Sequence, residues 1–117
     1  MNRWVTVTNQ TRGVTLGHKV VKADSFWTRA KGLLGKGSLA PGEGLLLSPC
    51  RGIHSYGMRF AFDAIYLDRQ YGVIHIIERM PPHRSGPMIR EAHAVLELPS
   101  GTVRATGTAI GDQLIIR

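Results

Sequence analysis

Apolar and polar residues alternate along several short segments, which is the period of a β-strand with one buried face. The first segment is Trp4–Thr8 (WVTVT), and β-like patterning continues through Val14–Leu16 and His18–Val21. Gly17 lies between the last two stretches, where it predicts a bulge or a turn. Further strands are predicted at 45–47, 62–67, 73–77 and 92–98 and at the C-terminal end of the sequence.

Two segments follow a helical rather than a β pattern. The segment 26–35 (FWTRAKGLLG) places its apolar residues on one side at helical spacing, with Asp24 or Ser25 as the N-cap and Gly35 as the terminating residue. The segment 102–106 (TVRAT) predicts a single helical turn, capped by Ser100 and closed by Gly107. Elsewhere, frequent glycine and proline favour short strands joined by turns.

These elements predict a mainly β fold, namely a compact small β-sandwich or barrel of about seven to nine short strands with one α-helix packed against it. The length of 117 residues predicts a single domain over 1–117, and no internal repeat is visible. Composition fits this interpretation, because 43% of the residues are hydrophobic and 20% are charged.

The apolar runs are too short to cross a bilayer as helices, and the N-terminal residues lack the apolar core of a secretory signal. Cys50 is the only cysteine, so the chain cannot form an internal disulfide or a cysteine-rich zinc site. A lone thiol suits a reducing compartment, and we expect a cytoplasmic protein without a membrane segment.

The formal net charge is +7, and eleven of the fifteen basic residues are arginine. Such a balance favours a polyanionic partner, but the arginines are scattered singly and form no basic run. Binding of nucleic acid is disfavoured further because the eight aromatic residues fall mostly in predicted core segments. It remains a third hypothesis, weak binding by the basic surface.

The stretch from Pro49 to Asp68 (PCRGIHSYGMRFAFDAIYLD) concentrates the side chains that could carry chemistry. Alternation places Asp63 on the same strand face as Ile65 and Leu67. A carboxylate on an apolar face must be paired or hydrogen-bonded, because burying it bare costs many kcal/mol. Asp63 therefore either ties neighbouring backbone to the sheet or orients a ligand.

Cys50, His54 and Met58 recur at intervals of four, and their soft donor atoms would suit copper. Pro49, Gly52 and Gly57 break any regular helix there, so the spacing favours packing over a metal site. Cys50 and His54 could also form a nucleophile and its base, with Asp63 as the third group. The sequence shows no metal or cofactor motif, and it leaves open whether the protein is an enzyme.

Several motifs in order along the chain resemble one family. They are GLLG (32–35), PGEGLLLSPC (41–50), IHSYGMRFAFDAIYLD (53–68), AVLELPSG (94–101) and GTAIGDQL (107–114). This set is similar to domain of unknown function 192 in its short bacterial form, over residues from about 18 to the C-terminus. Ala61 departs from the proline that many relatives carry at that position. The resemblance implies a compact, mainly β domain with one packed helix, and it implies no activity.

The leading hypothesis from the sequence is a non-catalytic β domain that binds a small anionic ligand or a protein partner through the loops 50–59 and 83–90. Both loops carry arginine and histidine without a structural reason in the pattern, and loops on a rigid β scaffold often carry binding sites. The predicted ligand-binding residues are Cys50, His54, Met58, Arg59, Asp63 and Arg84. In this hypothesis Arg59 and Arg84 contact the anion, and Asp63 holds Arg59 or His54 in place. The alternative is a metal-binding or hydrolytic site that uses Cys50, His54 and Asp63.

Overall fold

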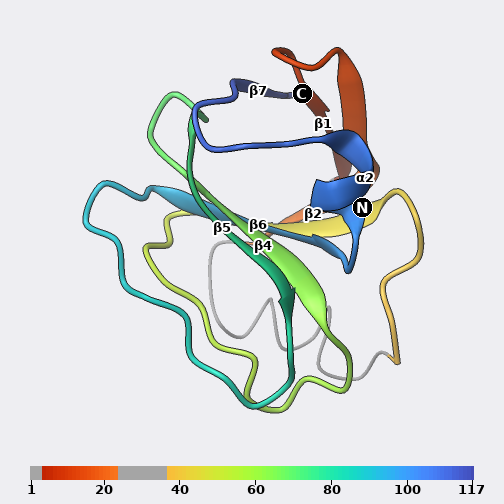
Figure 1. Cartoon of the computed structure of the whole chain (residues 1–117), viewed down its shortest axis with the longest axis vertical. Coiled ribbons are helices and arrows are strands. Elements are labelled where there is room, and N and C mark those ends of the chain that lie inside the picture. Colours follow the sequence, from red (N-terminus) through yellow and green to blue (C-terminus); the bar gives the residue numbers. More distant parts are fainter. Residues whose placement is uncertain (1–3, 24–36) are drawn as a thin grey trace.

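Seven strands and one short helix make up the described chain, which in this computed structural model comprises residues 4–23 and 37–117. The strands form one sheet in the order β5-β4-β6-β3-β2-β1-β7 (Figure 1). Their bounds are β1 Trp4–Asn9, β2 Val14–Ala23, β3 Glu43–Leu47, β4 Phe62–Leu67, β5 Val73–Met80, β6 Ala94–Pro99 and β7 Leu114–Ile116, and the helix α2 spans Thr102–Thr106.

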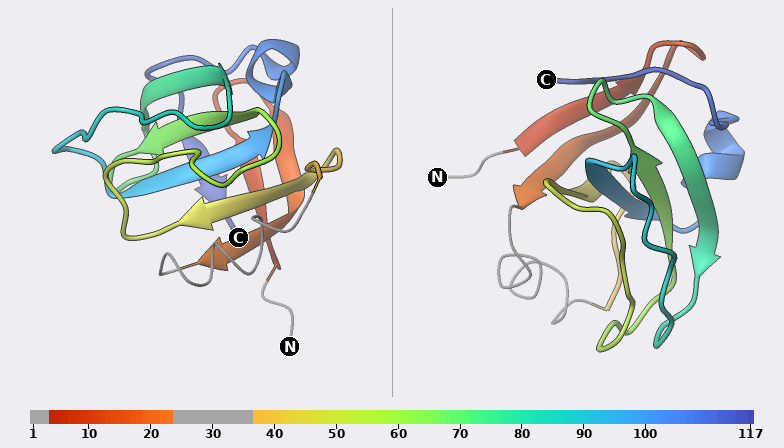
Figure 2. Two further views of the ribbon diagram at one scale, coloured as in Figure 1. Left: turned by 90° about the horizontal axis from the view of Figure 1, so that it is seen from below. Right: turned by 90° about the vertical axis from the view of Figure 1, so that its left-hand side faces the viewer.

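The sheet curls into a half-barrel that closes at one end. All neighbouring strands run antiparallel except β2 and β3, which pair in parallel. The edge strands β5 and β7 approach each other through an isolated bridge between Gly72 and Gln113. The N–H of Leu114 donates to the carbonyl of Tyr71 at 3.0 Å, which strengthens this contact. Figure 2 shows the resulting curvature of the sheet in two further views.

Two hydrophobic cores lie on opposite faces of the sheet. The inner core takes apolar residues from all seven strands and one from α2, namely Val7, Leu16, Val20, Leu46, Ile65, Leu67, Val73, Ala94, Leu96, Leu98, Val103 and Leu114. The outer core takes side chains from the opposite face of β2, β3, β4, β5 and β6 and from the loops that cover it, namely Ala23, Leu39, Leu45, Leu47, Ile53, Met58, Phe62, Ala64, Tyr66, Met80, Ala92 and Val95. Strands such as β4 are consequently buried on both faces.

Gly17 lies at an irregularity in the pairing of β1 with β2, where the register shifts around the Val7–Gly17 pair. A Cβ atom at this position would lie 3.0 Å from Val20 and 3.1 Å from the carbonyl oxygen of Gly42. The close approach of Gly42, just before β3, explains why glycine occupies the position, and the bulge or turn predicted at Gly17 corresponds to this shift of register.

Each strand predicted from the sequence corresponds to a strand of the structure, but some of the predicted bounds and one helix cap are corrected. β6 begins at Ala94 rather than at residue 92. β5 continues to Met80 rather than ending near residue 77, because Pro81 is the first residue that interrupts it. The N-cap of α2 is Gly101 in the left-handed conformation, with φ of 95°, and not Ser100. Gly107 closes α2 as expected. The helix predicted at 26–35 lies outside the described residues. Within residues 4–23 and 37–117, no helix is long and apolar enough to cross a membrane.

The loop between β3 and β4 and the loop between β5 and β6 run side by side across the outer core, and together we call residues 48–61 and 81–93 the loop layer (Figures 1 and 2). Backbone hydrogen bonds join them at intervals: Ile89 donates to Arg51 at 2.8 Å, and Gly86 donates to Ile53 at 2.8 Å. An isolated bridge also pairs His54 with Ser85. The two loops that the sequence analysis singled out are therefore neighbours in space.

Candidate functional site

Ser55 fastens the loop layer from inside. Its side chain is fully buried, and its Oγ accepts a hydrogen bond from the N–H of Arg84 at 2.8 Å. The same hydroxyl donates to the carbonyl oxygen of Pro81 at 2.5 Å. The backbone of Ser55 also bonds to His83 and Arg84, at 3.0 and 2.8 Å. One small polar residue thus fixes the path of the second loop over the first.

Tyr66 supports the same layer from the sheet. It is wholly buried in β4, and its hydroxyl donates to the carbonyl oxygen of Pro87 at 2.8 Å. Burial raises the pKa of Tyr66 to about 12, and the nearby Cys50 adds to the rise. The phenol therefore remains protonated and keeps donating to the loop at any physiological pH.

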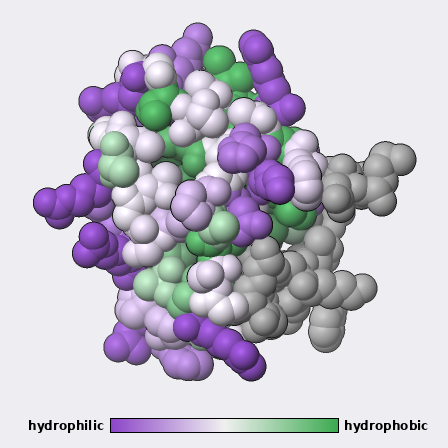
Figure 3. Space-filling model, turned by 90° about the vertical axis from the view of Figure 1, so that its right-hand side faces the viewer, coloured by the Kyte–Doolittle hydropathy of each residue, from purple (hydrophilic) through white to green (hydrophobic). Residues whose placement is uncertain are grey.

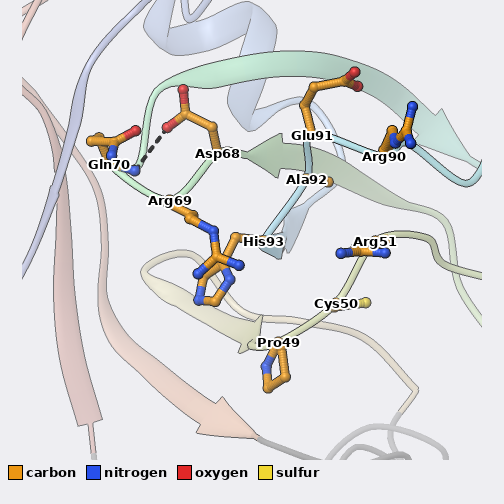
Figure 4. Close-up of a pocket in the computed structure, with 10 residues that line it drawn as sticks. All are labelled: Pro49, Cys50, Arg51, Asp68, Arg69, Gln70, Arg90, Glu91, Ala92 and His93. Carbon is orange, nitrogen blue, oxygen red and sulfur yellow. Dashed lines mark hydrogen bonds between the residues drawn. The ribbon is translucent and has the colours of Figure 1, made fainter.

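A surface cleft of about 340 Å³ opens where the loop layer meets the turn between β4 and β5. Three chain segments line it, namely Pro49–Arg51, Asp68–Gln70 and Arg90–His93 (Figure 4). Two backbone hydrogen bonds hold these segments together: the N–H of Cys50 donates to His93 at 2.8 Å, and the N–H of His93 donates to Leu67 at 2.7 Å. The cleft is thus attached to the end of β4.

Basic side chains dominate the cleft. Arg51, Arg69 and Arg90 come from three separate segments, all three are exposed, and His93 is half-buried beside them. Within the described chain, no hydrogen bond or ion pair joins any of these guanidinium groups to another residue. Guanidinium groups that line one cleft and have no internal partner are suited to bind carboxylate or phosphate oxygens.

The carboxylates of the cleft are arranged differently. Asp68 uses Oδ1 within its own turn, where it accepts from the N–H of Gln70 at 2.9 Å and of Gly72 at 2.8 Å. Figure 4 shows the carboxylates of Asp68 and Glu91 pointing the opposite way from the guanidinium of Arg69. The two acidic groups therefore leave the side of the cleft near Arg69 and His93 positive.

Of the six residues predicted from the sequence to bind a ligand, the cleft includes one, Cys50. Its thiol donates to the carbonyl oxygen of Gly52 at 2.9 Å. His54 lies in the loop layer with its ring 5.6 Å from that of Tyr56, while Arg59 and Arg84 are exposed outside the cleft lining. Met58 is 2% exposed and belongs to the outer core.

Asp63 shares the inner face of β4 with Ile65 and Leu67, as alternation predicted. Its Oδ2 accepts from the N–H of Val103 at 2.8 Å, and its Oδ1 accepts from the N–H of Arg79 at 2.8 Å. The expectation that Asp63 holds Arg59 or His54 is corrected, because the loop layer covers the other face of the sheet. Asp63 instead takes the place of the missing side-chain cap of α2 and anchors a bulge in β5.

The positions of Cys50, His54 and Asp63 test the alternative of a metal-binding or hydrolytic site. Among residues 4–23 and 37–117, no group of three histidine, cysteine, aspartate or glutamate side chains could hold a metal ion. A hydrolytic arrangement of Cys50 and His54 would need Asp63 as its orienting group, and both oxygens of Asp63 accept backbone hydrogen bonds on the far face. Neither alternative gains support from the geometry.

A second polar cluster lies at the closed end of the half-barrel. The carboxylate of Asp112 accepts from the Arg12 guanidinium at 2.9 Å, from the Asn9 amide at 3.0 Å and from the N–H of Ala109 at 2.9 Å. The hydrogen bond from Arg12 lowers the pKa of Asp112 to about 2, and the bonds from Asn9 and Ala109 contribute further. This cluster joins the β1–β2 turn to the segment before β7.

Figure 3 shows the side of the molecule that faces right in Figure 1, where α2 and the N-terminal strands lie. In the coloured part of this view, apolar side chains form small patches separated by hydrophilic ones. The most exposed large apolar residues of the described chain, Trp4, Tyr56, Met88 and Ile110, belong to different segments. Single exposed apolar residues of this kind are ordinary for a protein surface.

Sequence reasoning missed the residues that give the cleft its charge, namely Arg51, Arg69, Arg90 and His93. Arg51 and Arg90 lie within the predicted loops 50–59 and 83–90, but they were not among the six residues predicted to bind the ligand. Arg69 belongs to a turn between strands, and only the pairing of β4 with β5 and of β4 with β6 brings it beside His93. No local pattern in the sequence predicts that Arg69 and His93 lie side by side.

Two solved structures resemble the fold closely. A protein of unknown function from Novosphingobium aromaticivorans DSM 12444 matches with a TM-score of 0.79 and 24% identity, over 95% of this chain and 82% of that one. A protein described as a "putative transcription regulator" from Sinorhizobium meliloti 1021 matches with a TM-score of 0.75 and 27% identity, over 96% of this chain and 91% of that one.

No curated protein matches the sequence. The model of one family, DUF192, described as "Uncharacterized ACR, COG1430", matches residues 6–116, which is nearly the whole chain. This match confirms the resemblance seen in the sequence motifs, and no specific function comes with it. The chain therefore belongs to the DUF192 family, a family of unknown function.

Proposed function

We propose that this protein is a non-catalytic β domain that binds a small anionic ligand in the cleft lined by Arg51, Arg69 and Arg90. The observation that carries the proposal is that three arginines from three segments line one cleft of about 340 Å³. That volume lies at the small end of the range for ligand pockets. Two of the three arginines, Arg51 and Arg90, belong to the loop layer. The proposed site therefore overlaps the loops 50–59 and 83–90 that the sequence predicted to bind a ligand.

The rigidity of the scaffold supports a binding role. Backbone hydrogen bonds at Cys50 and His93 fix two segments of the cleft to the end of β4. The carboxylate of Asp68 fixes the third segment by closing its own turn. A site whose backbone is held in this way loses little conformational entropy when an anion binds. The lone thiol is compatible with a reducing compartment, which supports a role of the protein in the cytoplasm.

Isothermal titration with sulfate in a buffer of low ionic strength tests the proposal. Serine replaces each cleft arginine in turn, in the variants Arg51→Ser, Arg69→Ser and Arg90→Ser. Each loses one charge-assisted contact and should bind sulfate about tenfold more weakly than the wild type. The matched control is Arg104→Ser, which removes an exposed arginine of α2. Equal weakening in the control, or unchanged binding in all three cleft variants, would contradict the proposal.

Nucleic-acid binding is a second candidate because the similar Sinorhizobium meliloti protein is described as a "putative transcription regulator". The formal net charge of +7 favours the same interpretation. Binding of this kind weakens steeply with salt, because each neutralised phosphate releases counterions. Fluorescence anisotropy of a labelled duplex at increasing salt measures that slope. If the affinity for the duplex falls steeply with salt and the three cleft variants leave that dependence unchanged, the nucleic acid binds on another surface. If the duplex does not bind even at low salt, nucleic-acid binding is excluded.

A further inference from the structure

The loop layer is apolar where it meets the outer core and basic where it is exposed to solvent. Its buried apolar side chains, which include Ile53 and Met58, belong to the outer core. Its exposed side chains include four arginines, namely Arg51, Arg59, Arg84 and Arg90, which we call the basic surface. Glu91 is the only acidic residue of the layer. Four arginines against one glutamate give the layer a formal charge of +3, with histidine neutral.

The backbone ladder between the two loops spreads these arginines over a strip. At one end, the N–H of Ile89 donates to the carbonyl of Arg51 at 2.8 Å, and both Arg51 and Arg90 line the cleft. Four residues further along the first loop, the N–H of Ser55 donates to the carbonyl of Arg84 at 2.8 Å. At the rise of an extended chain these two ends are about 13 Å apart. That length accommodates a few consecutive phosphates of one strand.

The arginines at the far end of the strip have a fixed backbone and available guanidinium groups. The N–H of Arg84 donates to Oγ of Ser55 at 2.8 Å, and the preceding His83 is held in the left-handed conformation with φ of 62°. Arg59 follows a turn that the N–H of Met58 closes by donating to the carbonyl of Ser55. The Arg84 guanidinium donates to the carbonyl of His83 at 3.3 Å. Within residues 4–23 and 37–117, the Arg59 guanidinium forms no hydrogen bond or ion pair.

Tyr56 adds an exposed aromatic ring to this strip. Its side chain is 53% exposed, and its ring lies 5.6 Å from that of His54. The Ser85 hydroxyl donates to the Tyr56 hydroxyl at 3.4 Å. His54 and Ser85 pair across the ladder, so the ring lies against both loops. An exposed ring among basic side chains is the arrangement on which unstacked nucleobases bind. The burial predicted for most aromatic residues counted against nucleic acid, and Tyr56 is an exception to it.

We propose that the basic surface of the loop layer binds single-stranded nucleic acid, whose phosphates contact the four arginines while one base stacks on Tyr56. A duplex keeps its bases stacked on one another and offers the ring no free base. An acidic peptide would pair with the arginines, but its carboxylates make no use of the ring. The proposal deepens the second candidate function above by naming the surface and the strand, and it does not depend on sulfate binding in the cleft.

Fluorescence anisotropy with a labelled oligothymidylate of about fifteen nucleotides tests the stacking contact. The variant Tyr56→Leu loses the ring and should bind about tenfold more weakly, with an unchanged dependence on salt, because no phosphate contact is lost. Tyr56→Phe keeps the ring and should bind as the wild type does. The matched control is Trp4→Leu, which removes another exposed ring beside a cation, 4.7 Å from the Lys19 ammonium, and should leave binding unchanged.

The arginines are tested by the salt dependence of the same binding. The double variant Arg59→Ser with Arg84→Ser should reduce the slope of log affinity against log salt by about 1.4, because two phosphate contacts of a single strand are lost. The control Arg104→Ser with Arg117→Ser removes the same charge from exposed positions elsewhere and should keep the wild-type slope. Arg59 and Arg84 lie outside the cleft lining, so their double variant should also keep its sulfate affinity.

Four results would overturn the proposal. Binding that both Tyr56→Leu and the Arg59 and Arg84 double variant leave unchanged would mean that nucleic acid binds on another surface. Absence of binding at low salt would exclude a nucleic-acid partner, whereas sulfate binding in the cleft would stand. Tighter binding of a duplex of the same length would contradict the single strand. Tighter binding of polyglutamate of the same length would assign the basic surface to an acidic protein segment.

Discussion

The closed end of the half-barrel and the cleft beside the loop layer use charged residues in opposite ways. At the closed end, Asp112 accepts hydrogen bonds from Arg12, Asn9 and Ala109. On the inner face, Asp63 accepts from two backbone N–H groups. In the cleft, by contrast, three arginines of the described chain contact no internal acceptor. The hydrogen bonds of Asp112 and Asp63 serve folding, because buried charges persist only when they are paired.

The contrast separates residues that stabilise the protein from residues that are available for a ligand. A carboxylate with several internal donors has little capacity for another partner. An exposed guanidinium contributes little to stability, so its loss should cost little folding free energy. Substitutions in the two regions should therefore affect different measurements.

Removal of Asp63 should cause the largest loss of stability. In Asp63→Ala the N–H groups of Val103 and Arg79 lose their buried acceptor, and the free energy of unfolding should fall by about 3–5 kcal/mol. The matched control is Asp68→Ala, which also loses two backbone hydrogen bonds but at a more exposed turn, and should cost about 1 kcal/mol. Urea unfolding measures both, and equal losses would show that burial is not the cause.

Ser55→Ala should weaken the loop layer specifically. The N–H of Arg84 and the carbonyl of Pro81 both lose their hydrogen bond to the buried Ser55 hydroxyl, which should cost about 2 kcal/mol. Amide hydrogen exchange should become faster at residues 83–86 and stay unchanged in α2. Ser85→Ala is the control, because the Ser85 hydroxyl joins the same two loops only by an exposed bond of 3.4 Å to the Tyr56 hydroxyl and should cost little. Unchanged exchange in Ser55→Ala would mean that backbone bonds alone hold the two loops.

Asp112 should make stability depend on pH in the acid range. Its folded pKa of about 2 lies below the ordinary value of 3.8, so its stabilisation is present above 3.8 and is lost as the pH falls toward 2. Asp112→Asn should cost about 1–2 kcal/mol at neutral pH. The difference between wild type and variant should shrink over this acid window. A difference that stays constant from neutral pH to pH 2 would contradict the pairing with Arg12.

Arg51→Ser and Arg90→Ser should have the smallest effect on stability. Both side chains are exposed and form no ion pair within the described chain, so unfolding free energies should stay within about 0.5 kcal/mol of the wild type. Thermal unfolding compared with Arg104→Ser checks this expectation. A loss of 2 kcal/mol or more would show that these arginines support the fold.

The regular part of the fold could be predicted from the sequence, because it depends on local pattern. The alternation in β1, the all-apolar run around Asp63 in β4 and the glycine that closes α2 each follow from a few adjacent residues. Even the placement of Asp63 on the inner face followed from the two-residue period of a strand. The motifs also identified the family correctly.

The cleft could not be predicted, because it depends on contacts between distant segments. Arg69, Arg51 and His93 meet only after β4 has paired with β6 and the loop layer has closed over the outer core. Sequence reasoning grouped residues that lie close along the chain, and so it joined Met58 and Asp63, which lie on opposite faces of the sheet. It missed Ser55 as well, since a lone serine in a loop gives no sign of burial.

The most direct measurement combines unfolding free energy and sulfate affinity for two variants, Arg12→Ser and Arg69→Ser. Arg12 is paired with Asp112, whereas Arg69 lines the cleft without an internal partner in the described chain. We predict that Arg12→Ser lowers the free energy of unfolding, because Asp112 loses its charged partner, and leaves sulfate affinity unchanged. Arg69→Ser should leave stability within about 0.5 kcal/mol and weaken sulfate binding about tenfold. A loss of stability in Arg69→Ser with unchanged sulfate binding would contradict the account.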